Sequence, residues 1–167
     1  MAALILDRTD FSEHKIGTIT YYTSDDEGYY NCNLLTDGSF EKNTYQTNGY
    51  LTSTRKIPVI PGSSIQFNVP DTPGFEEKAS NYIKIGEYDI NKNWISRQHS
   101  NYDNNNVLFS LSPGTYYIIV CIQYINASNP IEKLKEKFSG TTIRGTVNDN
   151  LYGWFTPYEY SDYNDET

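Results

Sequence analysis

The sequence has few of the residue types that most enzymes and metalloproteins use for their chemistry. Its 167 residues include two cysteines, two histidines and one methionine. It contains none of the sequence signatures of serine hydrolases, P-loop nucleotide-binding proteins, dithiol oxidoreductases or zinc proteases. A glycosidase needs two carboxylates at a fixed separation, and sequence alone assigns that role to no acidic pair. We therefore expect a protein that is not an enzyme and has no cofactor.

Positive charge and long apolar runs are also scarce. Thirteen Lys and Arg residues stand against 21 Asp and Glu residues, which gives a net charge of −8. Because nucleic acids are bound mainly through cationic contacts, this balance argues against a nucleic-acid partner. No segment approaches the ~20 apolar residues of a membrane span, and the first residues lack the basic start of a secretory signal. We expect synthesis in a cytoplasm, with Cys32 and Cys121 as reduced thiols; a disulfide between them is the alternative.

The sequence does contain many short, tyrosine-rich segments separated by turn signals. Sixteen tyrosines are present, and turns are indicated at Asn48-Gly49, Pro61-Gly62 and Ser112-Pro113-Gly114. This pattern predicts an all-β protein, an antiparallel β-sandwich of jelly-roll type forming a single domain over residues 1–167. Strands are expected at 3–7, 15–23, 29–35, 57–60, 64–69, 81–90, from Trp94, and at 107–111, 115–125, 141–147 and 151–160. Residues 44–54 are expected to be a polar loop.

The run 115–125 is the longest apolar segment and is apolar on both faces, which predicts a central strand. Its even-numbered face should line the space between the sheets; these residues are Tyr116, Ile118, Val120, Ile122 and Tyr124. Its odd-numbered face, with Tyr117, Ile119 and Cys121, needs separate cover. The candidates for that cover are a helix at 129–139 and another subunit.

One short helix is expected near residues 130–138, inserted between strands. Asn129 suits the N-cap, Pro130 suits the first helical position, and apolar residues recur at helical spacing at Ile131, Leu134 and Phe138. The lysines of this helix, Lys133, Lys135 and Lys137, are expected to face solvent.

The strand at 81–90 has a break in its alternation. Ile83 and Ile85 share a face, and Glu87 would then follow them into the core. A β-bulge at Gly86 would shift the phase and turn Tyr88 inward instead.

Four segments carry a resemblance to a known family. They read Tyr50-Leu51, then Ile57-Pro58-Val59-Ile60-Pro61-Gly62, then Ile83-Lys84-Ile85-Gly86-Glu87-Tyr88-Asp89-Ile90-Asn91-Lys92-Asn93-Trp94-Ile95-Ser96, then Leu111-Ser112-Pro113-Gly114-Thr115-Tyr116-Tyr117-Ile118. Together they resemble the jelly-roll, carbohydrate-binding-module-like domains of bacteriophage tail and baseplate proteins and of other virion or bacterial surface proteins. The resemblance covers about residues 50–122. Ile118 and Ile119 occupy the region where those domains often place a strand arginine.

The resemblance implies a non-enzymatic structural protein on the exterior of a bacteriophage virion, made in the host cytoplasm. It would be a capsid decoration protein or a tail accessory protein, present in many copies beside other virion proteins, with weak adhesion to host-surface glycans. The residues implied for carbohydrate binding are Tyr88, Asp89, Trp94 and Tyr102. An N-terminal arm at 1–12 and an acidic tail at 158–167 lie outside the resemblance and are expected to dock to neighbours. The expected assembly contacts are Leu4, Ile5, Tyr152, Trp154 and Tyr158.

Several alternatives stay open on sequence alone. The chain could be a carbohydrate-binding module acting in receptor recognition, or an acidic DNA-mimic inhibitor. Its aromatic residues could fill a core, contact a subunit or stack on a sugar. The segment 89–93 has oxygen-bearing residues at alternate positions, as at the start of a calcium loop, but Trp94 stands where such a loop needs glycine. We therefore expect a plain hairpin turn there, with calcium as the alternative.

Overall fold

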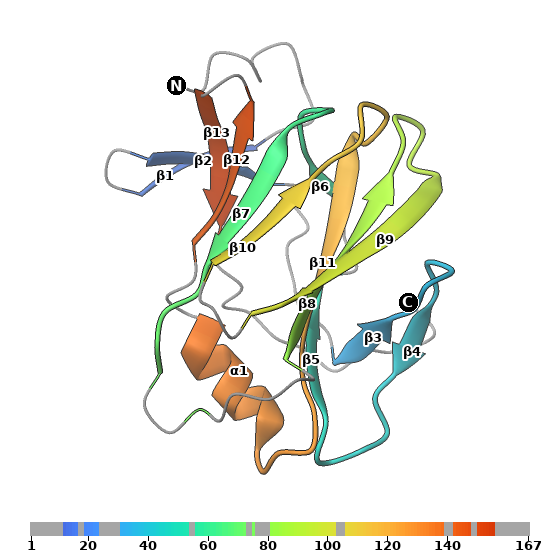
Figure 1. Cartoon of the computed structure of the whole chain (residues 1–167), viewed down its shortest axis with the longest axis vertical. Coiled ribbons are helices and arrows are strands. Elements are labelled where there is room, and N and C mark those ends of the chain that lie inside the picture. The colour runs from blue at the N-terminus through green and yellow to red at the C-terminus, as the bar shows by residue number, and fades with distance from the viewer. Residues whose placement is uncertain are drawn as a thin grey trace.

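The computed structural model describes residues 12–16, 19–23, 31–53, 56–72, 75, 81–102, 106–138, 142–147 and 150–155. Within these ranges two larger antiparallel sheets pack face to face (Figure 1). The predicted all-β sandwich with one short helix is therefore confirmed. One sheet contains β5 (Gly49–Thr52), β11 (Tyr117–Tyr124), β8 (Tyr82–Tyr88) and β9 (Trp94–Asn101) in that order, with β6 (Ile57–Pro58) also paired to β11. The other has the order β10 (Asn106–Ser110), β7 (Ser64–Asn68), β12 (Thr142–Val147) and β13 (Asn150–Phe155).

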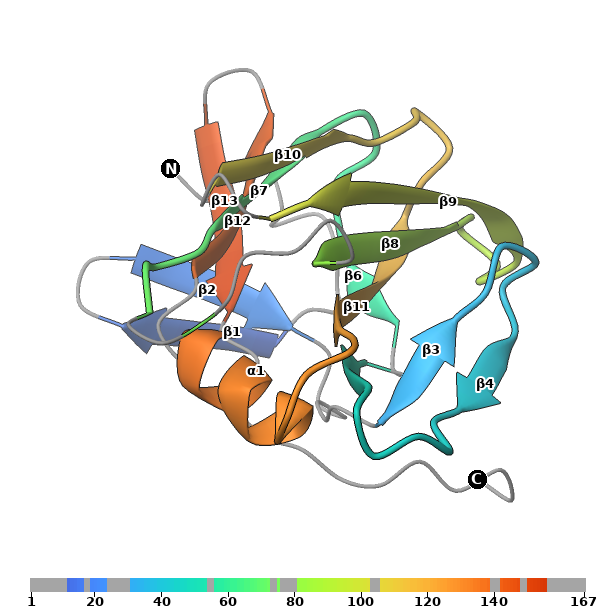
Figure 2. The same cartoon turned by 60° about the horizontal axis from the view of Figure 1, so that its bottom comes forward.

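Two hairpins and the helix flank this sandwich. Strands β1 (Ser12–Ile16) and β2 (Ile19–Thr23) form one hairpin, and β3 (Cys32–Leu34) and β4 (Phe40–Lys42) form the other. The helix α1 (Pro130–Phe138) lies at one end of the sandwich, while the β3–β4 hairpin lies beside the five-stranded sheet in both views (Figures 1 and 2). Within the described ranges no helix is long and apolar enough to cross a membrane.

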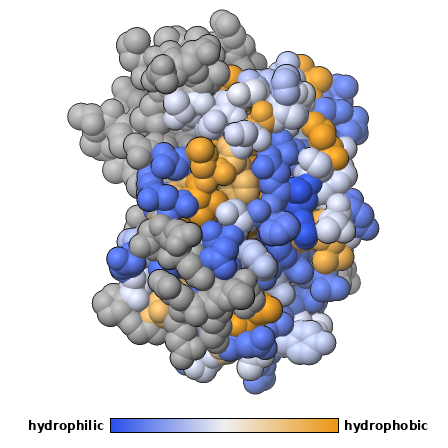
Figure 3. Space-filling model, viewed as in Figure 1, coloured by the Kyte–Doolittle hydropathy of each residue, from blue (hydrophilic) through white to orange (hydrophobic). Residues whose placement is uncertain are grey.

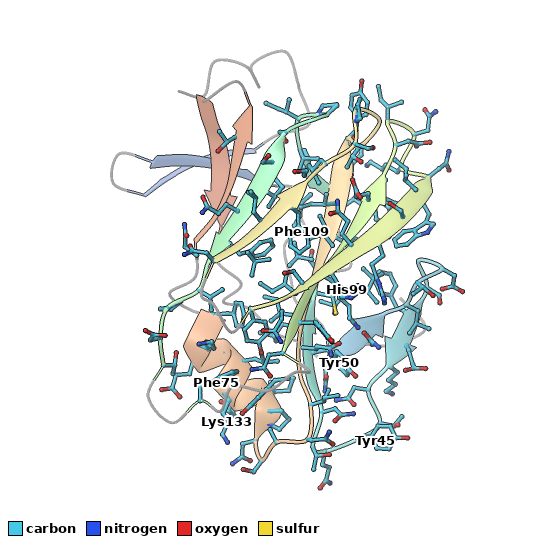
Figure 4. All side chains as sticks on the ribbon, viewed as in Figure 1. Tyr45, Tyr50, Phe75, His99, Phe109 and Lys133 are labelled. Carbon is cyan, nitrogen blue, oxygen red and sulfur yellow. The ribbon has the colours of Figure 1, made fainter. Side chains whose placement is uncertain are left out.

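The main core fills the space between the two sheets. Alternating residues of β7 and β10 face alternating residues of β8 and β11, because successive side chains of a strand point to opposite faces. Phe67 and Phe109 meet edge to face with ring centroids 5.8 Å apart, and Phe109 is seen between the sheets in Figure 4. Leu134 and Phe138 of α1 close one end of this core, and neither side chain has any exposed surface.

The strand β11 is central, as predicted. It pairs with β8 on one side and with β5 and β6 on the other, and all eight of its residues are buried. The predicted inner residues Ile118, Val120, Ile122 and Tyr124 belong to the main core. Tyr116 does not: it is half-buried and packs on the opposite face of the sheet.

The second apolar face of β11 has a cover that the sequence did not reveal. Tyr117, Ile119 and Cys121 form a smaller cluster with Leu34 of β3 and Tyr88 of β8. We call this side of the five-stranded sheet the outer face. The expectation that α1 or another subunit covers it is wrong, because the β3–β4 hairpin packs there and α1 packs on the inner side.

The orientation of the Glu87 side chain differs from the prediction for β8. The pairing of β8 with β11 runs without interruption from Ile83 to Tyr88, so Glu87 follows Ile83 and Ile85 inward and Tyr88 faces outward. The irregularity lies in the β8–β9 pairing, where Glu87 faces Ser96 and Tyr88 faces Trp94, leaving Ile95 as the extra residue. The predicted bulge at Gly86 is therefore wrong.

Inside the sandwich the carboxylate of Glu87 is surrounded by hydrogen-bond donors. Thr115 Oγ1 donates to it at 2.7 Å, Gln98 Nε2 at 3.1 Å, and Ser96 Oγ and the Ser112 amide at 3.3 Å each. These bonds stabilise a carboxylate with only 3% of its surface exposed, since a buried charge is tolerated where hydrogen bonds replace water.

Other boundaries differ from the prediction in smaller ways. The predicted loop at 44–54 contains β5, a four-residue strand that pairs with β11. The predicted single strand at 15–23 is the paired hairpin β1–β2. The helix α1 is confirmed, but Lys137 is buried rather than solvent-facing: its Nζ donates to the Pro70 carbonyl at 3.0 Å and lies 4.7 Å from the centre of the Phe75 ring.

Candidate functional site

The four predicted carbohydrate-binding residues do not lie together. Tyr88 and Trp94 are cross-strand partners on β8 and β9, with rings edge to face and centroids 5.4 Å apart, and Asp89 begins the turn between these strands. Tyr102 lies in the main core with no exposed surface. Its ring packs against Phe138 with centroids 5.1 Å apart, and its hydroxyl donates to the Gln123 carbonyl at 2.9 Å. Tyr102 therefore has no face to offer a sugar.

The turn from Asp89 to Asn93 is held by its own backbone and by one carboxylate. The Asp89 amide donates to the Asn93 carbonyl and the Lys92 amide donates to the Asp89 carbonyl, both at 2.9 Å. Asp89 Oδ1 accepts from the amides of Asn91 and Asn93, again at 2.9 Å each. This is a hairpin turn in which Asp89 has a structural role. No three His, Cys, Asp or Glu side chains come close enough to hold a metal ion within the described ranges.

Trp94 is fixed by two glycines that allow close approach. A Cβ at Gly86 in β8 would lie 2.7 Å from Trp94 Cζ3, and a Cβ at Gly38 in the β3–β4 turn would lie 2.6 Å from Trp94 Cδ2. The indole therefore packs against backbone from both the sheet and the hairpin, and it stays half-buried. Its position is set by the fold and does not depend on a ligand.

Two lysines lie over the tyrosines at this end of the outer face. Tyr88 and Tyr117 are direct cross-strand partners. Lys56 Nζ is 4.6 Å from the centre of the Tyr88 ring, and Lys92 Nζ is 5.1 Å from the centre of the Tyr117 ring. Both distances fit cation–π contacts. We call these four residues the lysine–tyrosine cluster.

The environment of this cluster shifts several pKa values. Burial, followed by the positive charge of Lys92, lowers the pKa of Lys56 below its ordinary value. Burial raises the pKa of the Tyr88 hydroxyl to about 12. The Tyr88 hydroxyl is therefore neutral at physiological pH. The cluster brings two basic residues together on a chain with a net charge of −8.

The remainder of the outer face is tied to the β3–β4 hairpin by polar contacts. Arg97 Nη1 donates to the Leu34 carbonyl at 2.9 Å, and Lys84 Nζ donates to Asn33 Oδ1 at 2.6 Å. Burial lowers the pKa of Lys84. Figure 4 shows Tyr50 and His99 on this side of the sheet, next to the hairpin. These two cations therefore hold the hairpin against the sheet through hydrogen bonds.

Both cysteines are buried as free thiols. Cys121 lies in β11 on the outer face, and burial raises the pKa of its thiol. An inaccessible thiol of this kind is a packing residue rather than a nucleophile.

The predicted assembly contacts fall largely outside the described ranges. Leu4, Ile5 and Tyr158 lie outside the described residues. Tyr152 and Trp154 belong to β13, the edge strand of the four-stranded sheet, but their side chains are outside the description. On the opposite edge strand, β10, Leu108 is 64% exposed, and hydrophobic surface gathers over this strand in Figure 3.

Sequence reasoning missed the two lysines for identifiable reasons. Lys56 precedes a two-residue strand and lies 32 positions before Tyr88 in the chain, so its contact depends on β6 and β8 both pairing with β11. Lys92 reaches Tyr117 from a turn position with a φ of 66°. The sequence does not mark Lys92 for a positive φ, because asparagine tolerates this conformation better than lysine and asparagines stand on both sides of it.

Comparison of the chain with protein-family models, with curated proteins and with solved structures finds no match.

Proposed function

We propose that this chain is a non-enzymatic structural protein on the exterior of a bacteriophage virion, and that it adheres weakly to glycans of the host surface. The resemblance of residues 50–122 to jelly-roll domains of phage tail and baseplate proteins supports the virion setting. The β8–β9 turn end of the outer face is the part of the molecule proposed to meet the glycan.

The observation that carries glycan contact is the fixed position of Trp94 beside an exposed polar turn. The indole is held against Gly38 and Gly86 without a ligand, so little ordering is required on binding. The side chains of Asn91 and Asn93 next to it are exposed. Amide side chains bind sugar hydroxyls, and the uncovered part of an indole packs on sugar C–H groups. Tyr88 is buried and packs edge to face against the indole, so its ring is not available to stack on a sugar.

A single such site would bind weakly, with a dissociation constant of about millimolar to micromolar, or about −4 to −8 kcal/mol. Many copies on one particle would convert this weak binding into firm adhesion, because later contacts become intramolecular. The hydrophobic surface over the edge strand β10, where Leu108 is exposed, supports a contact with a neighbouring subunit at a separate surface.

The glycan role can be tested by screening the protein, displayed as a tetramer, against an array of bacterial surface glycans. Hits should be lost when Asn91 and Asn93 are both replaced by alanine. They should be kept in Asn106→Ala, which removes an exposed amide from the other sheet. The absence of any hit at high protein concentration would refute glycan adhesion.

The assembly role can be tested separately on particles. Removal of residues 1–10 or 158–167 should abolish incorporation of the protein into the virion, because these segments are proposed to dock to neighbours. Truncated protein that reaches normal occupancy on particles would contradict that docking role.

A further inference from the structure

The lysine–tyrosine cluster holds two positive charges close together at an end of the sheet. The rings of Tyr88 and Tyr117 belong to directly opposed residues, whose Cβ atoms are about 5 Å apart in an antiparallel pair. Lys56 lies over one ring and Lys92 over the other. Burial first, and the positive charge of Lys92 second, lowers the pKa of Lys56.

Neither ammonium has a carboxylate partner within the described part of the chain. The ion pair found there joins Lys135 and Glu132 on α1, far from this end of the sheet. Asp89 is the acidic residue of the adjacent turn, but its Oδ1 accepts two backbone amides of that turn. In a chain with eight more acidic than basic residues, two neighbouring cations that find no acidic partner among the described residues need an explanation.

Lys92 has a left-handed backbone conformation within the closed hairpin turn. Its φ of 66° lies in the left-handed region, which is unfavourable for a side chain without a short polar group. Glycine or asparagine would adopt this conformation at lower cost, and asparagines flank the position on both sides. Residues in the left-handed region are enriched at binding and active sites, so a lysine at this position supports a role for its ammonium group.

The surroundings of the ammonium pair narrow the class of ligand. The turn that carries Lys92 and the start of β9 also present exposed apolar side chains, Ile90 (60% exposed) and Ile95 (40% exposed), and the half-buried indole of Trp94 packs against Tyr88. Asn91 and Asn93 add exposed amides. A free inorganic anion would use the ammonium groups alone, whereas a sugar that carries a carboxylate would use all of these groups.

We propose that Lys56 and Lys92 bind the carboxylate of an acidic sugar, such as a hexuronic acid unit, within the host-surface glycan. This inference rests on the proposed glycan-binding function and specifies its ligand. The two ammonium groups bind the carboxylate, the apolar side chains contact the C–H face of the ring, and the asparagines bind its hydroxyls. Specificity then comes from the charge, since a neutral sugar leaves both ammonium groups unpaired.

The test is a titration of the full chain with an oligogalacturonate and with a neutral maltooligosaccharide of the same length, followed by calorimetry at low salt. The oligogalacturonate should bind at least tenfold more tightly than the neutral sugar. Lys56→Gln and Lys92→Gly should each weaken its binding about tenfold or more. Lys92→Arg, which keeps the charge, and Lys133→Gln, which removes a charge from α1 instead, should bind as the wild type does.

The Lys92→Gly variant separates a binding role from a structural one. Glycine adopts a φ of 66° without strain, so this variant should keep or raise the midpoint of thermal unfolding while it loses affinity. A fall in the unfolding midpoint with unchanged affinity would assign Lys92 a packing role and overturn the proposal.

The remaining outcomes are distinguishable. Equal binding of both sugars, unaffected by Lys56→Gln and Lys92→Gly, would overturn the acidic-sugar inference and leave glycan adhesion standing. Binding of neither sugar, together with an empty glycan array, would overturn both. Competition by inorganic phosphate as effective as that of the oligogalacturonate would show a general anion site. Binding to anionic phospholipid vesicles in place of the sugar would show a membrane-contact site. Each of these last two results would overturn the sugar assignment.

Discussion

Replacement of Gly86 by alanine should destabilise the protein by forcing Trp94 away from the sheet. The new Cβ would lie 2.7 Å from Trp94 Cζ3 and 3.1 Å from Leu34 Cδ2. The indole cannot shift freely, because Gly38 of the hairpin turn also lies against it. Overpacking of this kind costs about 1–3 kcal/mol. In an open strand position the same change would add about 0.5–1 kcal/mol of stability, because glycine is a poor strand residue. A loss of stability in Gly86→Ala would therefore show that the indole is fixed against the strand, whereas a gain would show that it is not.

The free energy of unfolding is measured by guanidinium denaturation, followed by circular dichroism and by tryptophan emission. A Trp154→Phe background leaves Trp94 as the single indole, since the chain has two tryptophans. Emission of Gly86→Ala should shift to longer wavelength as the indole becomes more exposed. Gly114→Ala is the matched control: its nearest atom would be Ser112 Oγ at 3.9 Å, so no loss of stability is expected.

A double-mutant cycle tests the cause directly. The Trp94→Phe variant has a smaller ring, so adding Gly86→Ala to it should cost less than in the wild type, with a coupling energy of about 1 kcal/mol or more. If Gly86→Ala is as stable as the wild type and leaves the emission of Trp94 unchanged, the close packing of the indole between sheet and hairpin is refuted.

Two further predictions follow from buried ionisable groups. Glu87→Gln places an amide among four donors, so stability should fall by about 1–3 kcal/mol in the same denaturation assay; unchanged stability would contradict the role of the carboxylate. Burial raises the pKa of Tyr50 and of Tyr88 to about 12 from an ordinary value of 10. Because the folded state favours the neutral phenols, their contribution to stability is complete below pH 10 and is lost as pH rises through 12. Absorbance at 295 nm should show late-titrating tyrosines, and Tyr88→Phe should reduce the alkaline loss of stability; ordinary titration of every tyrosine would refute this prediction.

The sequence predicted the parts of the fold that depend on local pattern. The central strand β11 was predictable because its apolar run is long and its residues favour strands on both faces. The helix α1 was predictable because Asn129-Pro130 starts it and apolar spacing continues it. The strand β5 was missed because it has four residues in a polar setting, and its partner β11 lies about 70 positions away. Short strands of this kind form through their pairing rather than through their own propensity.

The candidate site was only half predictable for the same reason. Trp94 and Asp89 were found from the turn between two strands, which is a local signal. The inward position of Glu87 was missed, because a carboxylate is tolerated in the core only when donors from distant segments, such as Thr115 and Ser112, converge on it. Tyr102 was placed wrongly at the site because its aromatic side chain fits a core and a sugar equally well on sequence alone.

The outer face is covered by the β3–β4 hairpin over one part and by lysine side chains over another. This difference explains why a binding site would form at the lysine-covered end. Over Ile119 and Cys121 the cover is the β3–β4 hairpin, which is held by a hydrogen bond from the Arg97 side chain to the Leu34 carbonyl. Opening that part would expose a buried cluster and cost several kcal/mol. Over Tyr88 and Tyr117 the described cover includes two lysine side chains, and a cation–π contact at a partly buried site costs about 0.5–2 kcal/mol to break. These ammonium groups can therefore turn to a ligand while the sheet, the indole and the hairpin stay in place.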